Sequence, residues 1–277
     1  MLPKPSLSEP DMPAVITRGA FSAKAFGFTG KTGAASGTVG IFALGYTTAA
    51  SNIRDKYTYA CDTNGTAAAA SAASRYGSAA GNSTRGIFAL GIISVAASST
   101  RNKYTYACDT NGTAAAASAA SRYGSAAGNS TRGIFALGVI SGVGASTRDK
   151  YTYACDTNGS ATAASAASYV GSAAGNSTRG IFALGVISCA ASSTRNKYTY
   201  ACDTNGTAAA ASAASRYGSA AGNSTRGIFA LGYISCAAST TRNKYTYACD
   251  TNGSAAAASA ASYYGSAASN GITGVNV

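Results

Sequence analysis

The sequence predicts an all-β protein built from a repeated unit of 47 residues. The segment Lys-Tyr-Thr-Tyr-Ala-Cys-Asp-Thr-Asn-Gly occurs five times, starting at Lys56, Lys103, Lys150, Lys197 and Lys244. A second segment, Gly-Ile-Phe-Ala-Leu-Gly, recurs with the same spacing except for one step of 46 residues. All four prolines lie within residues 1–13, and their absence afterwards suits paired strands, because proline cannot donate to a sheet. A fixed period of this length indicates a repeat architecture.

Three strands of the unit are predicted from the copy at residues 76–121. Residues 76–81 form a short strand of small side chains, and residues 86–91 form an apolar strand bounded by glycine. Residues 103–107, with two tyrosines, form the third strand. The loop at residues 92–102 varies more between copies than any other part, and variable loops on a rigid scaffold are typical places for binding specificity.

The fourth segment of the unit, residues 113–121, is almost wholly alanine and serine. Asn-Gly in residues 109–112 predicts the hairpin turn before it. Alanine propensity alone would allow a helix in the fourth segment. The segment is too short to be stable as an isolated helix and has no large apolar stripe, so we predict a strand.

The tyrosines of the third strand are predicted to belong to the core. Tyr104 and Tyr106 are two residues apart, so both side chains lie on one face of a strand. Ten of the 18 tyrosines occupy this pair of positions. We expect these large rings to pack on the small alanines of the neighbouring sheet, and not to form a platform for sugars.

The order of these features resembles a blade of the kelch-type β-propellers. An Arg-Tyr-Gly segment at residues 75–77 precedes the first strand, Gly91 ends the second, and the aromatic third strand leads into a turn with Asp109. The chain lacks the tryptophan of the family's fourth strand and the second glycine of its glycine pair. The resemblance implies a β-propeller over residues 14–277. The near-identical copies are also similar to repeat proteins of marine bacteria and of phages, some of them in tail fibres.

The number of blades depends on how the two ends of the chain combine. Five units have all four strands. Residues 264–268 and 272–277 supply a first and a second strand, and residues 14–27 lie where a third and a fourth are needed. We therefore expect six blades in a ring closed by both ends of the chain, with five blades as the alternative. Ring closure leaves only short, protected strand edges.

The composition narrows the classes of partner. The net charge of +12 suits an acidic protein or glycan, or serves only to keep a weakly charged surface soluble. Long runs of Lys or Arg are absent, so nucleic acid is not favoured, and no stretch reaches the roughly 20 apolar residues of a membrane span. Residues 1–13 lack the apolar run of a signal peptide. We expect synthesis in the cytoplasm, with incorporation in a virion as one outcome.

The seven cysteines predict free thiols. Five of them occupy one repeated position, and Cys189 and Cys236 share a second. Equivalent residues of successive units lie too far apart for a disulfide, so we expect half-buried, reduced thiols in a reducing compartment. Because the chain has no histidine and no CxxC segment, and one carboxylate per turn is too few for calcium, neither a metal site nor a cofactor is expected.

Arginines are the candidate binding residues. In a propeller, the loops between second and third strands share one face with the connections between blades. A ring of guanidinium groups there would suit acidic glycans, phosphates or carboxylates, and the alternative is that each arginine caps its own blade. The candidates are Arg54, Arg101, Arg148, Arg195, Arg242, Arg75, Arg122 and Arg216. The opposite face would carry the aspartate turns with Arg85, Arg132, Arg179 and Arg226.

The sequence favours a structural or binding role over catalysis. It has no histidine, no clustered carboxylate pair, no phosphate-binding loop and no nucleophile elbow. One hypothesis is a component of a larger assembly, such as a phage tail or fibre, with the loop face meeting another subunit or a receptor. A free-standing module that binds proteins or acidic glycans is the other. The segment that would dock the chain in an assembly is the arm of residues 1–13, with Pro3, Lys4, Pro5, Pro10 and Pro13.

Overall fold

The computed structural model describes residues 33–34, 39–43, 45, 49–59, 61–265, 267–269 and 274–276. Every regular element in this part of the chain is a β-strand, and the strands form sheets of two to four strands. The prediction of an all-β fold is therefore confirmed. The arm at residues 1–13 and the candidate strands at residues 14–27 lie outside the described residues.

Four sheets repeat the same antiparallel, four-stranded arrangement in the order of the chain. The second sheet contains β6 (Ser78–Gly81), β7 (Arg85–Ala89), β10 (Arg101–Thr105) and β11 (Thr110–Ala114). The third contains β13 (Ser125–Gly128), β14 (Arg132–Ala136), β17 (Arg148–Thr152) and β18 (Thr157–Ala161). The fourth contains β19 (Ser172–Gly175), β20 (Arg179–Ala183), β23 (Arg195–Thr199) and β24 (Thr204–Ala208). The fifth contains β25 (Ser219–Gly222), β26 (Arg226–Ala230), β29 (Arg242–Thr246) and β30 (Thr251–Ala255).

The two ends of the described chain contribute smaller sheets. The first sheet contains β2 (Val39–Ala43), β3 (Arg54–Thr58) and β4 (Thr63–Ala67). The last sheet joins β1 (Gly33–Ala34) in parallel to β31 (Ala267–Ser269), which pairs antiparallel with β32 (Gly274–Asn276). The segment after the fifth sheet, where the sequence predicts a first and a second strand, thus contains two antiparallel strands.

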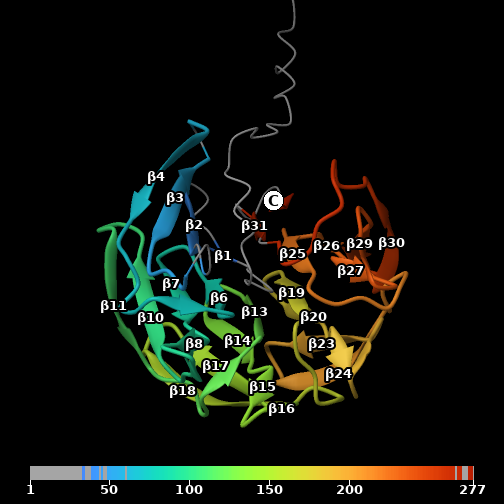
Figure 1. Cartoon of the computed structure of the whole chain (residues 1–277), viewed down its shortest axis with the longest axis horizontal. Helices are drawn as coiled ribbons and strands as arrows, with labels where there is room; N and C mark the ends of the chain where they lie inside the picture. Colours follow the sequence, from blue (N-terminus) through green and yellow to red (C-terminus); the bar gives the residue numbers. More distant parts are fainter. Residues whose placement is uncertain are drawn as a thin grey trace, which may run out of the picture.

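Four-stranded sheets are arranged around a common centre, which gives a propeller-like shape (Figure 1). Their first strands, β6, β13, β19 and β25, lie towards the centre, and their fourth strands lie at the rim. The first strands of successive sheets contact one another, and β1 contacts both β6 and β31, which in turn contacts β25. First strands of small residues suit this crowded centre, because they let neighbouring backbones approach closely.

The strand boundaries differ from the prediction at the third and fourth strands. β10 begins at Arg101, and β11 begins at Thr110, so Asn111 and Gly112 pair within the sheet and do not form the turn. Asp109 takes the left-handed backbone conformation of the turn instead, with φ of 50°. β11 ends at Ala114, and residues 115–120 form an irregular connection, neither strand nor helix. The prediction of a strand over residues 113–121 is therefore confirmed for residues 113–114 and wrong for residues 115–120, where Ala115 and Ser118 donate backbone hydrogen bonds to aspartates of the next sheet.

The core lies between neighbouring sheets. One cluster joins Ala80 and Ile87 of the second sheet to Phe135, Tyr151 and Tyr153 of the third. Tyr151 is fully buried, and its ring meets that of Tyr153 edge to face at a centroid distance of 5.7 Å. A buried tyrosine removes about 150–250 Å² from water, worth at most about 4–6 kcal/mol. The expected packing of large rings on small alanines is therefore present.

The cysteines differ from expectation in their exposure. All seven are free, but all are exposed, not half-buried. The reason is their place in the fold. Cys108 lies in the turn between β10 and β11, and Cys189 lies at the tip of the hairpin formed by β21 (Val186–Ile187) and β22 (Ala190–Ala191).

Candidate functional site

Two kinds of connection meet at one end of the sheets, which we call the loop face. The loop between β7 and β10 forms a short hairpin of β8 (Ile92–Ile93) and β9 (Ala96–Ala97). β8 pairs with β5 (Ser74–Arg75), which belongs to the connection from the first sheet. The third sheet repeats this with β12 (Ser121–Arg122), β15 (Val139–Ile140) and β16 (Val143–Gly144). Variable loops and intersheet connections therefore share the loop face.

A chain of backbone hydrogen bonds runs around the centre of the loop face. It links five equivalent residues that shortly precede the inner strands: Tyr76, Tyr123, Val170, Tyr217 and Tyr264. The N–H of each of the last four donates to the carbonyl of the equivalent residue one repeat earlier, at N···O distances of 2.9, 3.0, 3.1 and 2.9 Å. All five have a left-handed backbone, with φ between 51° and 59°. We call these five residues the axis mouth.

The tyrosines of the axis mouth stack in pairs. The rings of Tyr76 and Tyr123 lie 4.4 Å apart, and those of Tyr217 and Tyr264 lie 4.2 Å apart. Burial, followed by the neighbouring tyrosine, raises the pKa of Tyr123 and of Tyr264, so these phenols stay neutral at physiological pH. Val170 leaves the third position without a ring. The axis mouth is thus an aromatic, uncharged surface.

Three of the candidate arginines flank the axis mouth. The guanidinium carbons of Arg75, Arg122 and Arg216 lie 5.5, 5.7 and 5.3 Å from the ring centroid of the tyrosine that follows each one. Their side chains are half-buried. The third and fifth repeats have Tyr169 and Tyr263 at the same position. This position around the mouth therefore holds cationic side chains in some repeats and aromatic ones in others.

The other candidate arginines lie elsewhere, in the junctions between sheets. Arg54 donates to Asn111 Oδ1 at 2.8 Å and to Asn102 Oδ1 at 3.2 Å, and its guanidinium lies 4.3 Å from the ring centroid of Phe88. All these partners belong to the next sheet. Burial lowers the pKa of Arg54 to about 10, which still leaves it charged at neutral pH. The arginines buried in this way are Arg54, Arg101, Arg148 and Arg195. A soluble ligand has no access to them, and Arg242 is the half-buried equivalent in the fifth sheet.

One junction differs in charge from the other three. Arg101 donates to the carboxylate of Asp149 at 2.8 Å, and both side chains are buried. At the corresponding places Arg148 and Arg195 meet the neutral amides of Asn196 and Asn243. Burial lowers the pKa of Arg101, and Asp149 opposes that shift. The same buried cation is thus satisfied by an acid in one junction and by an amide in the others.

The turn aspartates of the second to fifth sheets form a second link across the junctions. Asp109 accepts hydrogen bonds from Lys56 at 2.7 Å and the backbone N–H of Ala68 at 2.9 Å, both from the preceding repeat. It also accepts the phenol of Tyr104 at 2.5 Å. The hydrogen bond from Lys56, followed by those from Tyr104 and Ala68, lowers the pKa of Asp109 to about 2. Sequence reasoning assigned these aspartates only to the turn, although Lys56 and Asp109 recur at a fixed separation.

The face opposite the loop face carries a third link. Arg85 donates to the backbone carbonyl of Tyr153 at 2.8 Å, and Asn82 donates to that of Ser130 at 2.9 Å. The equivalent bonds from Arg132 and Arg179 have lengths of 2.9 Å. Most polar landmarks of the repeat therefore bind the neighbouring sheet and are not free to bind a ligand.

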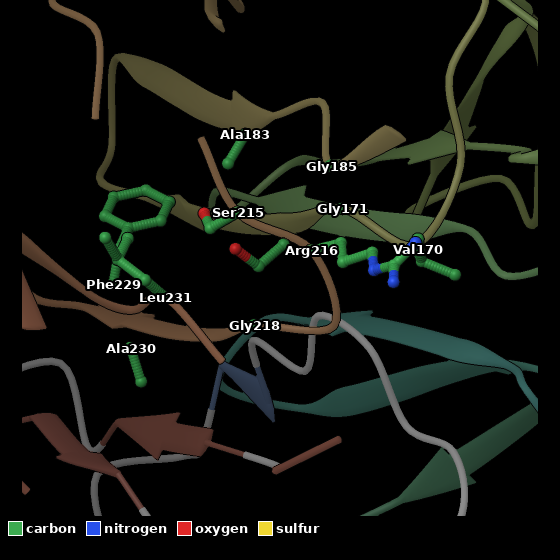
Figure 2. Close-up of a pocket in the computed structure, with 11 residues that line it drawn as sticks. Val170, Gly171, Ala183, Gly185, Ser215, Arg216, Gly218, Phe229, Ala230 and Leu231 are labelled. Carbon is green, nitrogen blue, oxygen red and sulfur yellow. The ribbon is translucent and has the colours of Figure 1, made fainter. Parts of the chain in front are cut away.

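The crevices between sheets are narrow. The crevice between the fourth and fifth sheets is lined by Gly171, Phe229 and Leu231, with Val170 and Arg216 at one end (Figure 2). Tyr169 takes the place of Arg216 in the equivalent crevice one repeat earlier. Each holds about 10 Å³, roughly the room for one water molecule. Small-molecule sites usually offer about 300–1,000 Å³.

Comparison with known proteins informs the fold. No protein-family model matches the chain, and no curated protein matches it in sequence. Among solved structures, the chain is similar to one titled "Structure of YjhT", with a TM-score of 0.61 over 78% of this chain and 81% of that chain. The sequence identity is 7%, so the likeness concerns the fold alone. The described residues contain neither a helix able to cross a membrane nor a cluster of three metal-ligating side chains.

Proposed function

We propose that this chain is a non-enzymatic, kelch-like β-propeller of six blades that serves as a structural and binding component of a larger assembly, such as a phage tail or fibre. The observation that carries the proposal is the repeated junction. Each pair of successive sheets from the first to the fifth is joined by a buried arginine and by a lysine–aspartate pair. Rigid, interchangeable units of this kind suit a structural part.

Six blades are supported by the contacts at the centre. The inner strands contact one another in the order β1, β6, β13, β19, β25, β31 and back to β1. β31 and β32 have the register of the first and second strands of a blade, because Ala268 pairs with Val275 as Ala80 pairs with Ile87. In the proposed ring, residues 14–27 add the third and fourth strands of the sixth blade.

The non-enzymatic part of the proposal rests on how the polar residues are used. The repeated lysines, aspartates and buried arginines are engaged in the junctions. Pockets of substrate size are not offered by the two crevices described above. The half-buried arginines and the tyrosines of the axis mouth remain accessible at the loop face, and that surface suits binding of a partner.

A second candidate function is a free-standing module for proteins or acidic glycans. The arrangement of Arg75, Arg122 and Arg216 around one mouth favours it, since guanidinium groups bind carboxylates and phosphates in two-point contacts. Replacing all three by tyrosine keeps residues that the third and fifth repeats already have there. We expect the affinity of this triple variant for acidic glycans to be at least about tenfold lower than that of the unchanged protein. Equal affinities of the variant and the unchanged protein would contradict a glycan site there.

Size fractionation of native source material in high salt, with the chain followed by mass spectrometry, tests the assembly. Sedimentation with large particles is the expected result. If the chain instead runs at the mass of a single copy, the assembly is contradicted and the free-standing module is the function that stands. Arm variants Pro10→Ala and Pro13→Ala then report whether residues 1–13 dock the chain, because they should weaken its retention in the particles.

A further inference from the structure

The fifth repeat has tyrosine at two positions of the loop face where every other repeat has at most one, Tyr46 in the first and Tyr169 in the third. Tyr233 stands where the second, third and fourth repeats have Ile92, Val139 and Val186. Tyr263 stands where Arg75, Arg122 and Arg216 lie in other repeats. Two separate positions of a nearly invariant unit thus add two aromatic rings to the loop face.

The structure brings these rings together with two tyrosines of the axis mouth. The Tyr233 ring lies 5.4 Å from Tyr263 and 6.5 Å from Tyr217, and Tyr263 lies 5.2 Å from Tyr264. The guanidinium of Arg216 lies 5.3 Å from the Tyr217 centroid and 5.2 Å from that of Tyr233. Tyr263 is 45% exposed. We call these five residues the aromatic patch.

The chemistry of the aromatic patch fits a proline-rich peptide. Tyrosine-lined surfaces hold the extended polyproline II conformation, because proline rings stack on aromatic faces and little conformational entropy is lost. Tyrosine hydroxyls and the Arg216 guanidinium can donate to the free backbone carbonyls of such a peptide. The nearby guanidinium also favours an acidic side chain beside the prolines.

The chain itself contains a segment with these properties. All four prolines lie within residues 1–13, and Pro10-Asp-Met-Pro13 has the three-residue proline spacing that matches one turn of polyproline II. Glu9 and Asp11 flank Pro10 in a protein that is otherwise basic. We propose that residues 1–13 of the chain dock on its own aromatic patch, with an acidic side chain of the arm towards Arg216.

The topology of the last sheet places the arm's attachment near the patch. β1 pairs in parallel with β31, with Gly33 opposite Ala268. The chain therefore enters β1 at the end of the sheet where Tyr264 precedes β31. In the proposed ring, residues 14–27 form the third and fourth strands of the sixth blade, and a third strand begins at the loop face, as β10 does after the β8–β9 hairpin. The arm then leaves the blade on the face that carries the aromatic patch. Attachment to the same chain gives an effective concentration of the order of millimolar, which favours this arm over that of a second copy.

This inference goes beyond the proposed function, because it places the arm in the isolated protein. An assembly partner that binds the arm would have to displace it from the patch. If the arm does not bind the patch, docking to other subunits stands as proposed. The two ideas therefore fail in different experiments.

The test uses an endoproteinase that cleaves before aspartate. The rate at which it cleaves the full-length chain before Asp11 is measured by mass spectrometry of the intact protein. Protection is the rate for a synthetic peptide of residues 1–13 divided by the rate for the chain. We expect protection of at least about tenfold, as a millimolar effective concentration gives for a Kd near 0.1 mM. The double variant Tyr233→Val and Tyr263→Arg should lose it. These substitutions install residues found in other repeats, so the fold should be kept.

Tyr169→Arg, which makes the same exchange in the third repeat, is the matched control and should keep full protection. A second variant, Arg216→Gln, should also reduce protection, because it removes the positive charge that faces the acidic side chain of the arm. Equal rates for chain and peptide, or equal protection in the double variant, would overturn the proposal. Protection that disappears on dilution would assign the patch to the arm of a second copy and overturn the intramolecular contact.

Discussion

The junctions between sheets and the axis mouth follow opposite rules, although both are built from the same five repeats. In the junctions the residues barely change. Arg54 and its equivalents, the lysine–aspartate pairs and the buried tyrosines recur in each copy. At the axis mouth Val170 replaces a tyrosine, and beside it Tyr169 and Tyr263 replace arginines. Invariance therefore accompanies the intersheet contacts that stabilise the ring, and variation accompanies the loop face.

The junctions also offer an internal comparison of buried charge. The cation of Arg101 faces the carboxylate of Asp149, whereas Arg148 faces the amide of Asn196 in the same geometry. Desolvating two charges costs several kcal/mol, which their attraction offsets only with good hydrogen bonding. The charged junction should therefore be no more stable than its neutral neighbours while both partners are present, but more sensitive to the loss of one.

The largest expected effect is the loss of Arg101. Arg101→Met leaves Asp149 buried without its cation and should lower the free energy of unfolding by about 3–5 kcal/mol. Arg148→Met leaves a neutral amide and should cost about 1–3 kcal/mol. Chemical denaturation of both variants measures the difference. Asp149→Asn in the Arg101→Met background should recover part of the loss, and equal costs for the two methionine variants would contradict the role of buried charge.

The next prediction compares the stability effects of removing two phenol groups, that of Tyr198 in β23 and that of Tyr200 just after it. Tyr198 donates its phenol to the carboxylate of Asp203, so Tyr198→Phe should destabilise by about 1.5–3 kcal/mol. The phenol oxygen of Tyr200 is buried, and no described residue supplies it with a hydrogen bond. Tyr200→Phe should therefore be neutral or slightly stabilising in thermal melting. A loss of stability in Tyr200→Phe equal to that in Tyr198→Phe would show that this phenol is satisfied.

How much could be predicted from the sequence differs between these two regions. The period, the all-β class and the burial of Tyr104 follow from residue patterns within one unit, and the structure agrees with them. The partners of Arg54 and Asp109 belong to the next or the preceding unit, and no local pattern identifies them. Asn111 and Gly112 predicted a turn, because that dipeptide usually forms one. Asp109 lies in the turn instead, and its carboxylate accepts hydrogen bonds from Lys56 and Ala68 of the preceding unit.

The candidate site shows the same limit. Arg54 and Arg75 both recur from repeat to repeat and both adjoin variable loops, so the sequence could not separate the buried series from the accessible one. The separation depends on burial against Phe88 and on hydrogen bonds to the next sheet. The replacements at Tyr169 and Tyr263 were visible in the sequence as breaks in the repeat. Only the structure shows that these two residues adjoin the axis mouth.

A smaller effect is expected from acid on the lysine–aspartate pairs. The pKa of Asp109 is about 2, well below its unfolded value near 4, because the folded protein stabilises the carboxylate. A lowered pKa adds stability above pH 4 that is lost as the pH falls from about 4 to 2. Lys56→Met should cost roughly 0.2–1 kcal/mol at pH 7, since the pair is partly exposed. Its melting temperature should meet that of the unchanged protein near pH 2.

Lys244→Met is the control for this titration. Lys244 occupies the equivalent position in the fifth sheet, and the described residues provide it with no ion pair. The variant should melt like the unchanged protein at both pH values. If Lys56→Met keeps its deficit at pH 2, the lysine acts through packing of its aliphatic stem and not through Asp109.

An effect of similar size concerns Val170, the one position of the axis mouth without a tyrosine. Val170 has a φ of 51°, a left-handed conformation that is strained for a β-branched side chain. Tyrosine has no branch at Cβ and adopts the same left-handed φ at the other four positions, so Val170→Tyr should relieve part of the strain and stabilise by about 1 kcal/mol. Tyr123→Val is the reverse exchange and should destabilise by a similar amount in thermal melting. If Val170→Tyr destabilises, the axis mouth has no room for a fifth ring, and crowding would explain why this position departs from the repeat.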